Sequence, residues 1–187
     1  SLQRGFGCSV GARGLPLALT DHFRRRVAVA EPHDAHFDEH LGLLTVAALL
    51  PEEWEKRLLD MNVERLRDRD LAWADMVFVG AMAIQRASAR QVIARCTGAG
   101  VRVVAGGPLF TAEPEAFPEV DHLVLDEAEL TLPAFLDDVQ NGRAQKCYRA
   151  SGYCDLHASP VPAWNLVRTK RYASMSVQFS RGCPFNC

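Results

Sequence analysis

The sequence predicts an α/β protein with a doubly wound, mainly parallel, five-stranded sheet of the Rossmann-like or flavodoxin-like kind. From residue 26 onward, short apolar runs alternate with segments of helical spacing. This alternation is typical of β-α-β units, because parallel strands are joined by helical crossovers. The runs are also nearly continuous in apolar residues, as expected of strands that are buried on both faces.

The apolar runs and the helical spacing define each expected element. Strands are expected at residues 27–30, 57–60, 75–82, 101–105 and 122–125, and helices at residues 41–54, 85–99 and 127–139. Pro51 stops the regular part of the first helix, because proline has no N–H to donate. Gly100 ends the second helix, and the Asn-Gly pair at 141–142 ends the third.

The segment after the last expected helix has a different composition. Residues 143–170 contain Pro160 and Pro162 in a Gly- and Ser-containing stretch, which predicts a linker. Residues 172–179 then alternate between apolar and polar like the first strand of another domain, and lead into Ser-Arg-Gly-Cys-Pro-Phe-Asn-Cys. We therefore expect a divergent or disordered N-terminus at residues 1–25, a sheet domain at 26–142, a linker at 143–170 and the start of a second domain at 171–187.

Composition and charge disfavour several classes of protein. The 187 residues are 48% hydrophobic and 24% charged, with a formal net charge of −2. This balance is ordinary for a soluble globular domain and offers no basic surface for nucleic acid. No run approaches the roughly 20 apolar residues of a membrane-spanning helix, and residues 1–20 do not contain the continuous apolar stretch expected of a secretory signal. A cytoplasmic location with reduced cysteines is expected.

The turn at residues 106–108, Gly-Gly-Pro, is a candidate ligand-binding element. In open parallel sheets, ligands bind beyond the carboxyl ends of the strands, and this turn follows the expected fourth strand. Two glycines allow close approach of the backbone and positive φ angles, and the proline stiffens the exit. A tight turn without a ligand explains the same residues, and the motif lacks the Lys-Ser/Thr of a phosphate loop.

Cys183 and Cys187 form a C-x3-C motif in a loop rich in turn residues. Two thiolates on such a loop can converge on one soft metal centre. Two cysteines do not complete a four-coordinate iron or zinc site, so on spacing alone a pair of incidental thiols remains the simpler interpretation.

The polar segment after the first strand offers a second set of metal ligands. Asp34 and His36 suggest a D-x-H-x-x-G loop that would present a histidine to cobalt, but Glu39 occupies the glycine position. His33, His36 and His40 could also share one face of a helix. A solvated polar loop is the simpler interpretation.

Three further cysteines and two glutamates complete the candidates. Cys96 lies in an apolar helix and is expected in the core, whereas Cys147 and Cys154 lie in linker-like sequence without an obvious partner. Glu127 and Glu129 begin the last helix, where they would interact with the helix dipole or with a ligand.

Four motifs occur in an order that carries a resemblance to a known family. They are residues 41–62 (LGLLTVAALLPEEWEKRLLDMN), 105–111 (AGGPLFT), 126–130 (DEAEL) and 180–187 (SRGCPFNC). Together they resemble the B12-binding-domain-containing radical SAM proteins, over most of the chain from Leu41 to its end. The sequence of the first motif is similar to that found in the branch of the family that contains the hopanoid methylases.

This resemblance implies a fold, cofactors and a chemistry. An N-terminal Rossmann-like domain would hold cobalamin, and a partial (β/α) barrel would follow. The barrel would open with C-x3-C-x2-C, whose cysteines hold a [4Fe–4S] cluster that binds S-adenosylmethionine and generates a 5′-deoxyadenosyl radical. The implied reaction is methylation of an unactivated carbon in a small-molecule or lipid-like substrate, with a flavodoxin or ferredoxin as the reductant.

The resemblance also assigns residues in this sequence. Cys183 and Cys187 would be the first two cluster ligands, and the third would fall three positions past Cys187. We therefore expect the 187-residue chain to be a truncated portion that is inactive by itself. The implied corrinoid-binding residues are Ala81, Met82, Gly106, Gly107, Pro108, Thr111, Glu127 and Glu129.

The sequence departs from the family pattern at two places, and two alternative functions are considered. Asp126 occupies a position that is usually glycine, where a Cβ would crowd the ligand, and the segment before Leu41 does not resemble the first strand and loop of the family. The main alternative is a non-enzymatic carrier module for a corrinoid or a nucleotide. A receiver-like signalling domain is disfavoured, because the chain lacks its clustered acidic residues and the lysine after its last strand.

Overall fold

The computed structural model describes residues 25–33, 41–172 and 181. Its centre is a six-stranded sheet with the order β2-β1-β3-β4-β5-β6, in which every neighbouring pair is parallel. The strands are β1 (Arg26–Glu31), β2 (Glu55–Asp60), β3 (Met76–Gly80), β4 (Arg102–Gly106), β5 (His122–Val124) and β6 (Cys147–Tyr148). The predicted parallel α/β fold is therefore confirmed.

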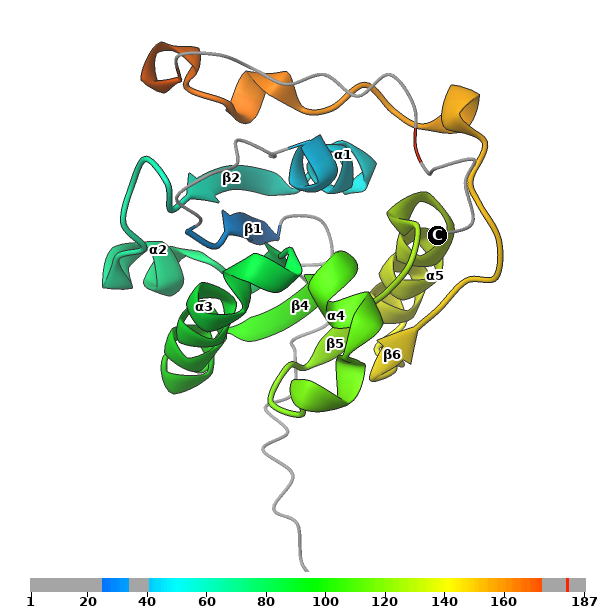
Figure 1. Cartoon of the computed structure of the whole chain (residues 1–187), viewed down its shortest axis with the longest axis horizontal. Coiled ribbons are helices and arrows are strands. Elements are labelled where there is room, and N and C mark those ends of the chain that lie inside the picture. Colours follow the sequence, from blue (N-terminus) through cyan, green and yellow to red (C-terminus); the bar gives the residue numbers. More distant parts are fainter. Residues whose placement is uncertain (1–24, 34–40, 173–180, 182–187) are drawn as a thin grey trace, which may run out of the picture.

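Helices cover both faces of this sheet, as the doubly wound prediction requires. They are α1 (Leu41–Leu49), α2 (Asp68–Trp73), α3 (Arg86–Gly98), α4 (Pro108–Ala112) and α5 (Ala128–Gln140). Figure 1 shows α1 and α5 on one side of the sheet and α2, α3 and α4 on the other. In the described part of the chain, no helix is long and apolar enough to cross a membrane.

Two hydrophobic cores result from the alternation of side chains along the strands. Val27 and Val29 of β1 belong to the core beneath α1 and α5, where Phe78 and Phe135 meet edge to face with ring centroids 6.1 Å apart. The intervening residues of β1, together with Val77, belong to the core beneath α2, α3 and α4. The sheet thus buries both faces, which explains the continuous apolar runs in its sequence.

The first helix is shorter than predicted. It ends at Leu49, and β2 already begins at Glu55, so residues 50–54 form a turn. Trp54, the last residue of the predicted helix, is instead buried in the turn, and the guanidinium of Arg25 lies 5.6 Å from its ring centroid. The short helices α2 and α4 were not predicted, because elements of five or six residues leave little periodicity to detect.

The sheet also has one strand more than the five predicted. β6 lies within the segment predicted as a linker and pairs with β5, where the Leu123 and Leu125 N–H groups donate to the Lys146 and Tyr148 carbonyls at 2.8 and 3.0 Å. A strand of two residues has no hydrophobic pattern of its own, so the sequence alone could not indicate it.

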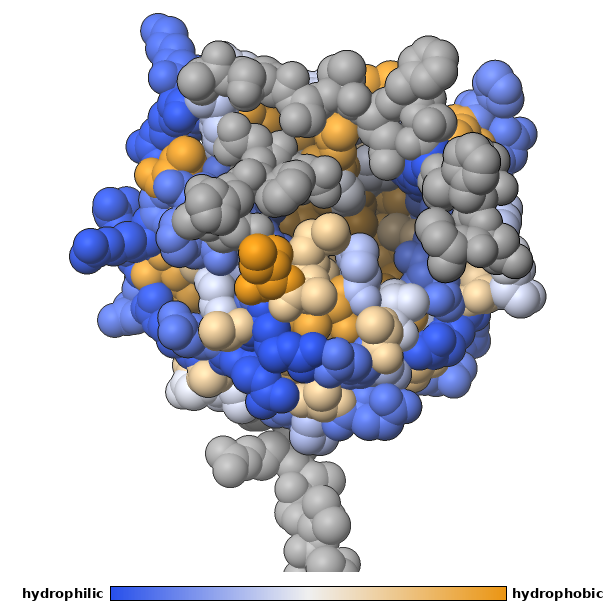
Figure 2. Space-filling view, viewed as in Figure 1, coloured by the Kyte–Doolittle hydropathy of each residue, from blue (hydrophilic) through white to orange (hydrophobic). Residues whose placement is uncertain are grey.

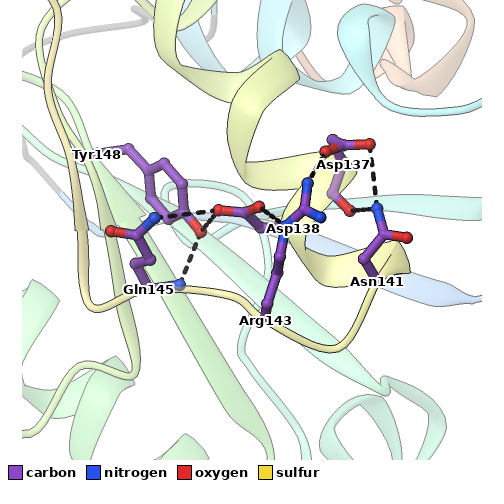
Figure 3. Close-up of polar contacts among 6 residues, drawn as sticks. All are labelled: Asp137, Asp138, Asn141, Arg143, Gln145 and Tyr148. Atoms are coloured by element: carbon purple, nitrogen blue, oxygen red, sulfur yellow. Dashed lines mark hydrogen bonds and ion pairs between the residues drawn. The ribbon is translucent and has the colours of Figure 1, made fainter.

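A polar network fastens β6 to the C-terminal end of α5 (Figure 3). The Asp138 carboxylate accepts hydrogen bonds from Arg143 Nε at 2.6 Å and from the Tyr148 hydroxyl at 2.9 Å. The Tyr148 oxygen in turn accepts the Gln145 N–H at 2.7 Å. The hydrogen bonds from Arg143 and Tyr148 lower the pKa of Asp138, which therefore stays ionised in its buried position.

Candidate cofactor site at the carboxyl edge of the sheet

The strands of the sheet end together at one side of the molecule, called here the carboxyl edge. The chain order reverses between β1 and β3, so the loops that follow these two strands lead to helices on opposite faces. Ligands of open α/β sheets bind at such a reversal. Gly80 and Gly106 end the neighbouring strands β3 and β4 and lie side by side in register.

The structure brings the predicted residues after β3 and β4 together at this edge. The Leu109 N–H, in the first turn of α4, donates to the Ala81 carbonyl at 3.0 Å. Gly107 lies against the same residue, because a Cβ at this glycine would stand 3.3 Å from the Ala81 oxygen. Pro108 is the first residue of α4, where the missing N–H costs no hydrogen bond.

The two glycines of the turn are needed for different reasons. Gly107 has φ +91°, which a side chain would strain, as the sequence predicted. Gly106 has no positive φ, but a Cβ there would stand only 2.5 Å from the Val124 carbonyl oxygen of the neighbouring strand. The close approach at Gly106 is therefore to β5.

The surface around these glycines is apolar. Met82 and Ile84 follow β3 with 42% and 65% of their surface exposed, and Leu130 in the first turn of α5 is 42% exposed. Figure 2 shows hydrophobic side chains gathered at the centre of one face, with hydrophilic ones around them. A glycine backbone flanked by exposed apolar side chains offers room and apolar contact for a broad, flat ligand.

Gln85 is a buried residue at this edge that sequence reasoning missed. Its Oε1 accepts the Met82 N–H at 2.8 Å, and its Nε2 donates to the Pro32 carbonyl at 3.0 Å. The side chain thus links the loop after β3 to the loop after β1 and is itself only 4% exposed. A glutamine following the apolar stretch AMAI was the available signal.

Two carboxylates end neighbouring strands at the other side of the reversal. Glu31 and Asp60 are paired in register at the ends of β1 and β2, and both are buried. Asp60 accepts the Asn62 N–H at 2.8 Å and the Tyr172 hydroxyl at 2.6 Å. Burial and this hydrogen bond raise the pKa of Tyr172. Asn62 also lies 3.0 Å from His33 Nδ1.

Asp126 adopts a backbone conformation that favours glycine. Its φ of +63° is the one positive value among the non-glycine residues that the structure describes. Its N–H donates to Thr111 Oγ1 at 3.0 Å, and its carboxylate accepts the Ala150 N–H at 3.2 Å. The backbone at this position thus has the conformation that glycine favours, and it is occupied by an aspartate, which tolerates this region better than most residues.

Glu127 and Glu129 lie at the start of α5 and face Arg181. Arg181 donates to Glu127 Oε2 at 2.7 Å and to Glu129 Oε1 at 2.8 Å. The Ser159 hydroxyl donates to Glu129 at 2.6 Å. Burial raises the pKa of Glu129, but the hydrogen bonds from Arg181 and Ser159 outweigh it and lower the pKa overall.

Cys154 belongs to the same group, so the expectation that it lacks a partner is wrong. Its thiol donates to Glu127 Oε2 at 3.3 Å, and Arg181 Nη1 lies 3.4 Å from its sulfur. Burial, the hydrogen bond to Glu127 and the charge of Glu129 raise the pKa of the thiol. Cys154, Glu127 and Glu129 place ligand atoms within 4.8 Å of one another, as a metal site would, but the Arg181 guanidinium supplies the positive charge they face.

The other sequence-based candidates divide into described and undescribed residues. Cys96 is fully buried in α3, as predicted, and burial raises its pKa to about 11. The candidates that lie outside the described residues are Asp34, His36, Glu39, His40, Cys183 and Cys187. Of the strand expected at residues 172–179, only Tyr172 is described.

Known proteins resemble this chain over most of its length. A family model for the B12 binding domain matches residues 29–136. An uncharacterized methyltransferase of Synechocystis sp. is 40% identical over 149 residues, and the hopanoid C-2 methylase of Rhodopseudomonas palustris is 34% identical over 150 residues. The bacteriochlorophyllide d C-8(2)-methyltransferase of Chlorobaculum tepidum is 26% identical over 156 residues.

These alignments cover most of the chain but a minor part of each relative. They include 79%, 78% and 79% of the chain, respectively. The chain spans 28% of the length of the first two relatives and 34% of the third.

Proposed function

This chain belongs to the B12-binding domain family, and from that premise we propose that its carboxyl edge binds a corrinoid for a methyltransferase that uses radical chemistry. The proposal rests on one observation: the residues that the family model matches include those that form the site. The matched residues 29–136 include the glycine-lined, apolar edge formed by the ends of β3 and β4.

The residues of that edge have distinct tasks in the proposal. Gly106 and Gly107 let the turn pack closely against β5 and Ala81, which would set the shape of the site, and the exposed side chain of Met82 would offer apolar contact. Pro108 and Thr111 hold the turn, since Thr111 is bonded to the Asp126 N–H. Cobalamin, when bound, supplies a carrier for a methyl group, and these residues would orient it and exclude water from one of its faces.

The radical chemistry rests on the sequence and on the relatives. Cys183 and Cys187 would hold a [4Fe–4S] cluster together with a third cysteine, because thiolates are the ligands that iron–sulfur clusters require. The cluster and S-adenosylmethionine supply a radical, and a flavodoxin or ferredoxin would be the source of the electron. Two relatives are named as methyltransferases of a hopanoid and of a bacteriochlorophyllide, which supports a small-molecule or lipid-like substrate for this chain.

The proposal is tested by anaerobic titration of the chain with hydroxocobalamin, followed by gel filtration and absorbance. We expect about one corrinoid to co-elute per chain. Met82→Glu, which places a charge on the apolar edge, should weaken binding at least tenfold, because burying an unpaired carboxylate is costly. Val161→Glu, at a 79% exposed valine outside the matched residues, is the matched control and should bind normally.

Two outcomes would contradict the proposal. Elution of free cobalamin from a folded chain would refute a corrinoid site in this chain. Equal binding by the Met82→Glu variant and by its control would refute the assignment of the site to this edge.

A further inference from the structure

One arginine joins three segments that are distant in the sequence. The guanidinium of Arg181 lies between the carboxylates of Glu127 and Glu129, with nitrogen–oxygen distances of 2.7 and 2.8 Å. The side chains are only 26%, 22% and 10% exposed, respectively. A guanidinium shared by two shielded carboxylates is held more firmly than an ordinary surface ion pair, because charge-assisted hydrogen bonds are strong and solvent screens them less.

The N-terminal end of α5 stabilises the negative charges of Glu127 and Glu129, which bind the Arg181 guanidinium. Glu127 is the N-cap residue of the helix and Glu129 lies in its first turn, so the helix dipole stabilises both negative charges. The segment after β6 closes the group from the other side, through the Ser159 hydroxyl at 2.6 Å from Glu129 and the Cys154 thiol at 3.3 Å from Glu127. The two carboxylates are thus held by further contacts besides those with Arg181.

A second attachment lies further back along the chain. The Tyr172 hydroxyl donates to Asp60, the last residue of β2, at 2.6 Å, and Arg171 lies 3.2 Å from Glu64 in the turn that follows. Asp60 ends β2 and Glu127 follows β5, and these two strands are four strand spacings apart, or about 19 Å. The nine residues from Tyr172 to Arg181 reach at most about 31 Å, so the chain can be attached at both ends of the carboxyl edge.

We propose that Arg181 is a positioning residue, which holds the chain immediately before the C-x3-C motif at the carboxyl edge through Glu127 and Glu129. Arg181 precedes Cys183 by two residues, so the Cα atoms of the two can be at most about 7 Å apart. The benefit of this attachment rests on the proposed function, because a cluster bound by the C-x3-C motif would then be kept near the proposed corrinoid site. The attachment itself depends only on the described residues.

Trypsin tests the attachment, because the protease must draw the Arg181 side chain into its own pocket before it cuts the Arg181–Gly182 bond. The rate to measure is the initial formation of the product 1–181, identified by intact mass at low conversion. In the unaltered chain this product should form slowly. Glu129→Gln, which removes the charge but keeps the shape, should raise the rate about tenfold. Glu127→Gln should raise it as well.

Matched variants separate this effect from general loosening. Glu113→Gln removes another glutamate that pairs with an arginine, Arg86, and should leave the rate of formation of 1–181 unchanged. Glu129→Asp keeps the carboxylate and should restore most of the protection. The denaturation midpoint of each variant shows whether the fold is intact.

The results distinguish the attachment from the proposed function. Equal rates for Glu129→Gln and the unaltered chain, or an equal rise with Glu113→Gln, would overturn the attachment. Cobalamin titration of the same proteins tests the corrinoid site independently. Protection of Arg181 in a chain that binds no cobalamin would support the attachment and refute the corrinoid function.

Discussion

Asp126 permits a test of how much backbone strain the carboxyl edge contains. Its φ of +63° is one that glycine adopts readily and that a Cβ disfavours. Replacing it with glycine and with alanine separates the backbone conformation from the contacts of the carboxylate. Both variants lose the hydrogen bond from the Ala150 N–H and the ion pair with Arg149, so these losses cancel in the comparison.

The remaining difference is the cost of a Cβ at positive φ. A non-glycine residue in the left-handed region costs roughly 1–2 kcal/mol. Asp126→Gly should therefore be more stable than Asp126→Ala by about that amount. For a domain of this size, 1 kcal/mol shifts the melting temperature by about 2–4 °C, so the two variants should melt about 2–8 °C apart.

Thermal unfolding followed by circular dichroism measures this difference, and two other glycines calibrate it. Gly100 has φ +72° with open space around its Cβ position, so Gly100→Ala should cost about the same 1–2 kcal/mol. Gly42 lies in α1, also with open space, and Gly42→Ala should stabilise the chain by about 0.5–1 kcal/mol. Equal melting temperatures for Asp126→Gly and Asp126→Ala would refute the assignment of strain to this residue.

Three further outcomes follow from packing and ionisation. Gly106→Ala would press a Cβ against the backbone of β5 and should lower the free energy of unfolding by about 2 kcal/mol or more, measured by urea denaturation; an unchanged midpoint would contradict the register of β4 and β5. Tyr148→Phe should cost about 1–3 kcal/mol in the same assay. Hydrogen bonds from Arg143 and Tyr148 lower the pKa of Asp138 in the folded chain below its unfolded value near 4. The stability that these bonds provide is therefore present above about pH 4, and it is lost as the pH falls through the pKa of the folded state. The Tyr148→Phe variant should raise that folded pKa and thus lose less stability on acidification, whereas an acid limb identical to that of the unaltered chain would contradict this coupling. Cys96, with a pKa of about 11, should resist alkylation at pH 8 until the chain unfolds, and peptide mass spectrometry that finds it labelled in the native protein would contradict its burial.

The sequence was sufficient to predict the parts of the fold that repeat a pattern. The run at residues 75–82 predicted β3, and the helical spacing before Gly100 predicted α3, because several apolar residues share one period there. The need for glycine at position 107 could also be predicted, since a Gly-Gly-Pro turn after a strand favours a positive φ. At Gly106 the same reasoning missed the contact with β5, which depends on strand order.

The contacts that build the carboxyl edge could not be predicted, because they join residues far apart in the chain. Tyr172 and Asp60 are 112 residues apart, and Arg181 and Glu127 are 54 residues apart. Spacing rules describe neighbours within one helix or strand and say nothing about such pairs. Cys154 was missed for the same reason, since its partner glutamate lies on the far side of β6 in the sequence.

The two edge strands of the sheet limit association between copies of this chain. β2 carries Lys56 and Arg57 in its exposed half, with the Arg57 guanidinium 3.8 Å from the ring centroid of Trp73, and β6 is only two residues long. An edge strand that is charged or very short offers few backbone groups for a strand of another molecule to pair with. Native sheets use such edge strands to avoid aggregation through backbone hydrogen bonds. The hydrophobic central strands are therefore separated from the same strands in other molecules by one charged strand and one very short strand.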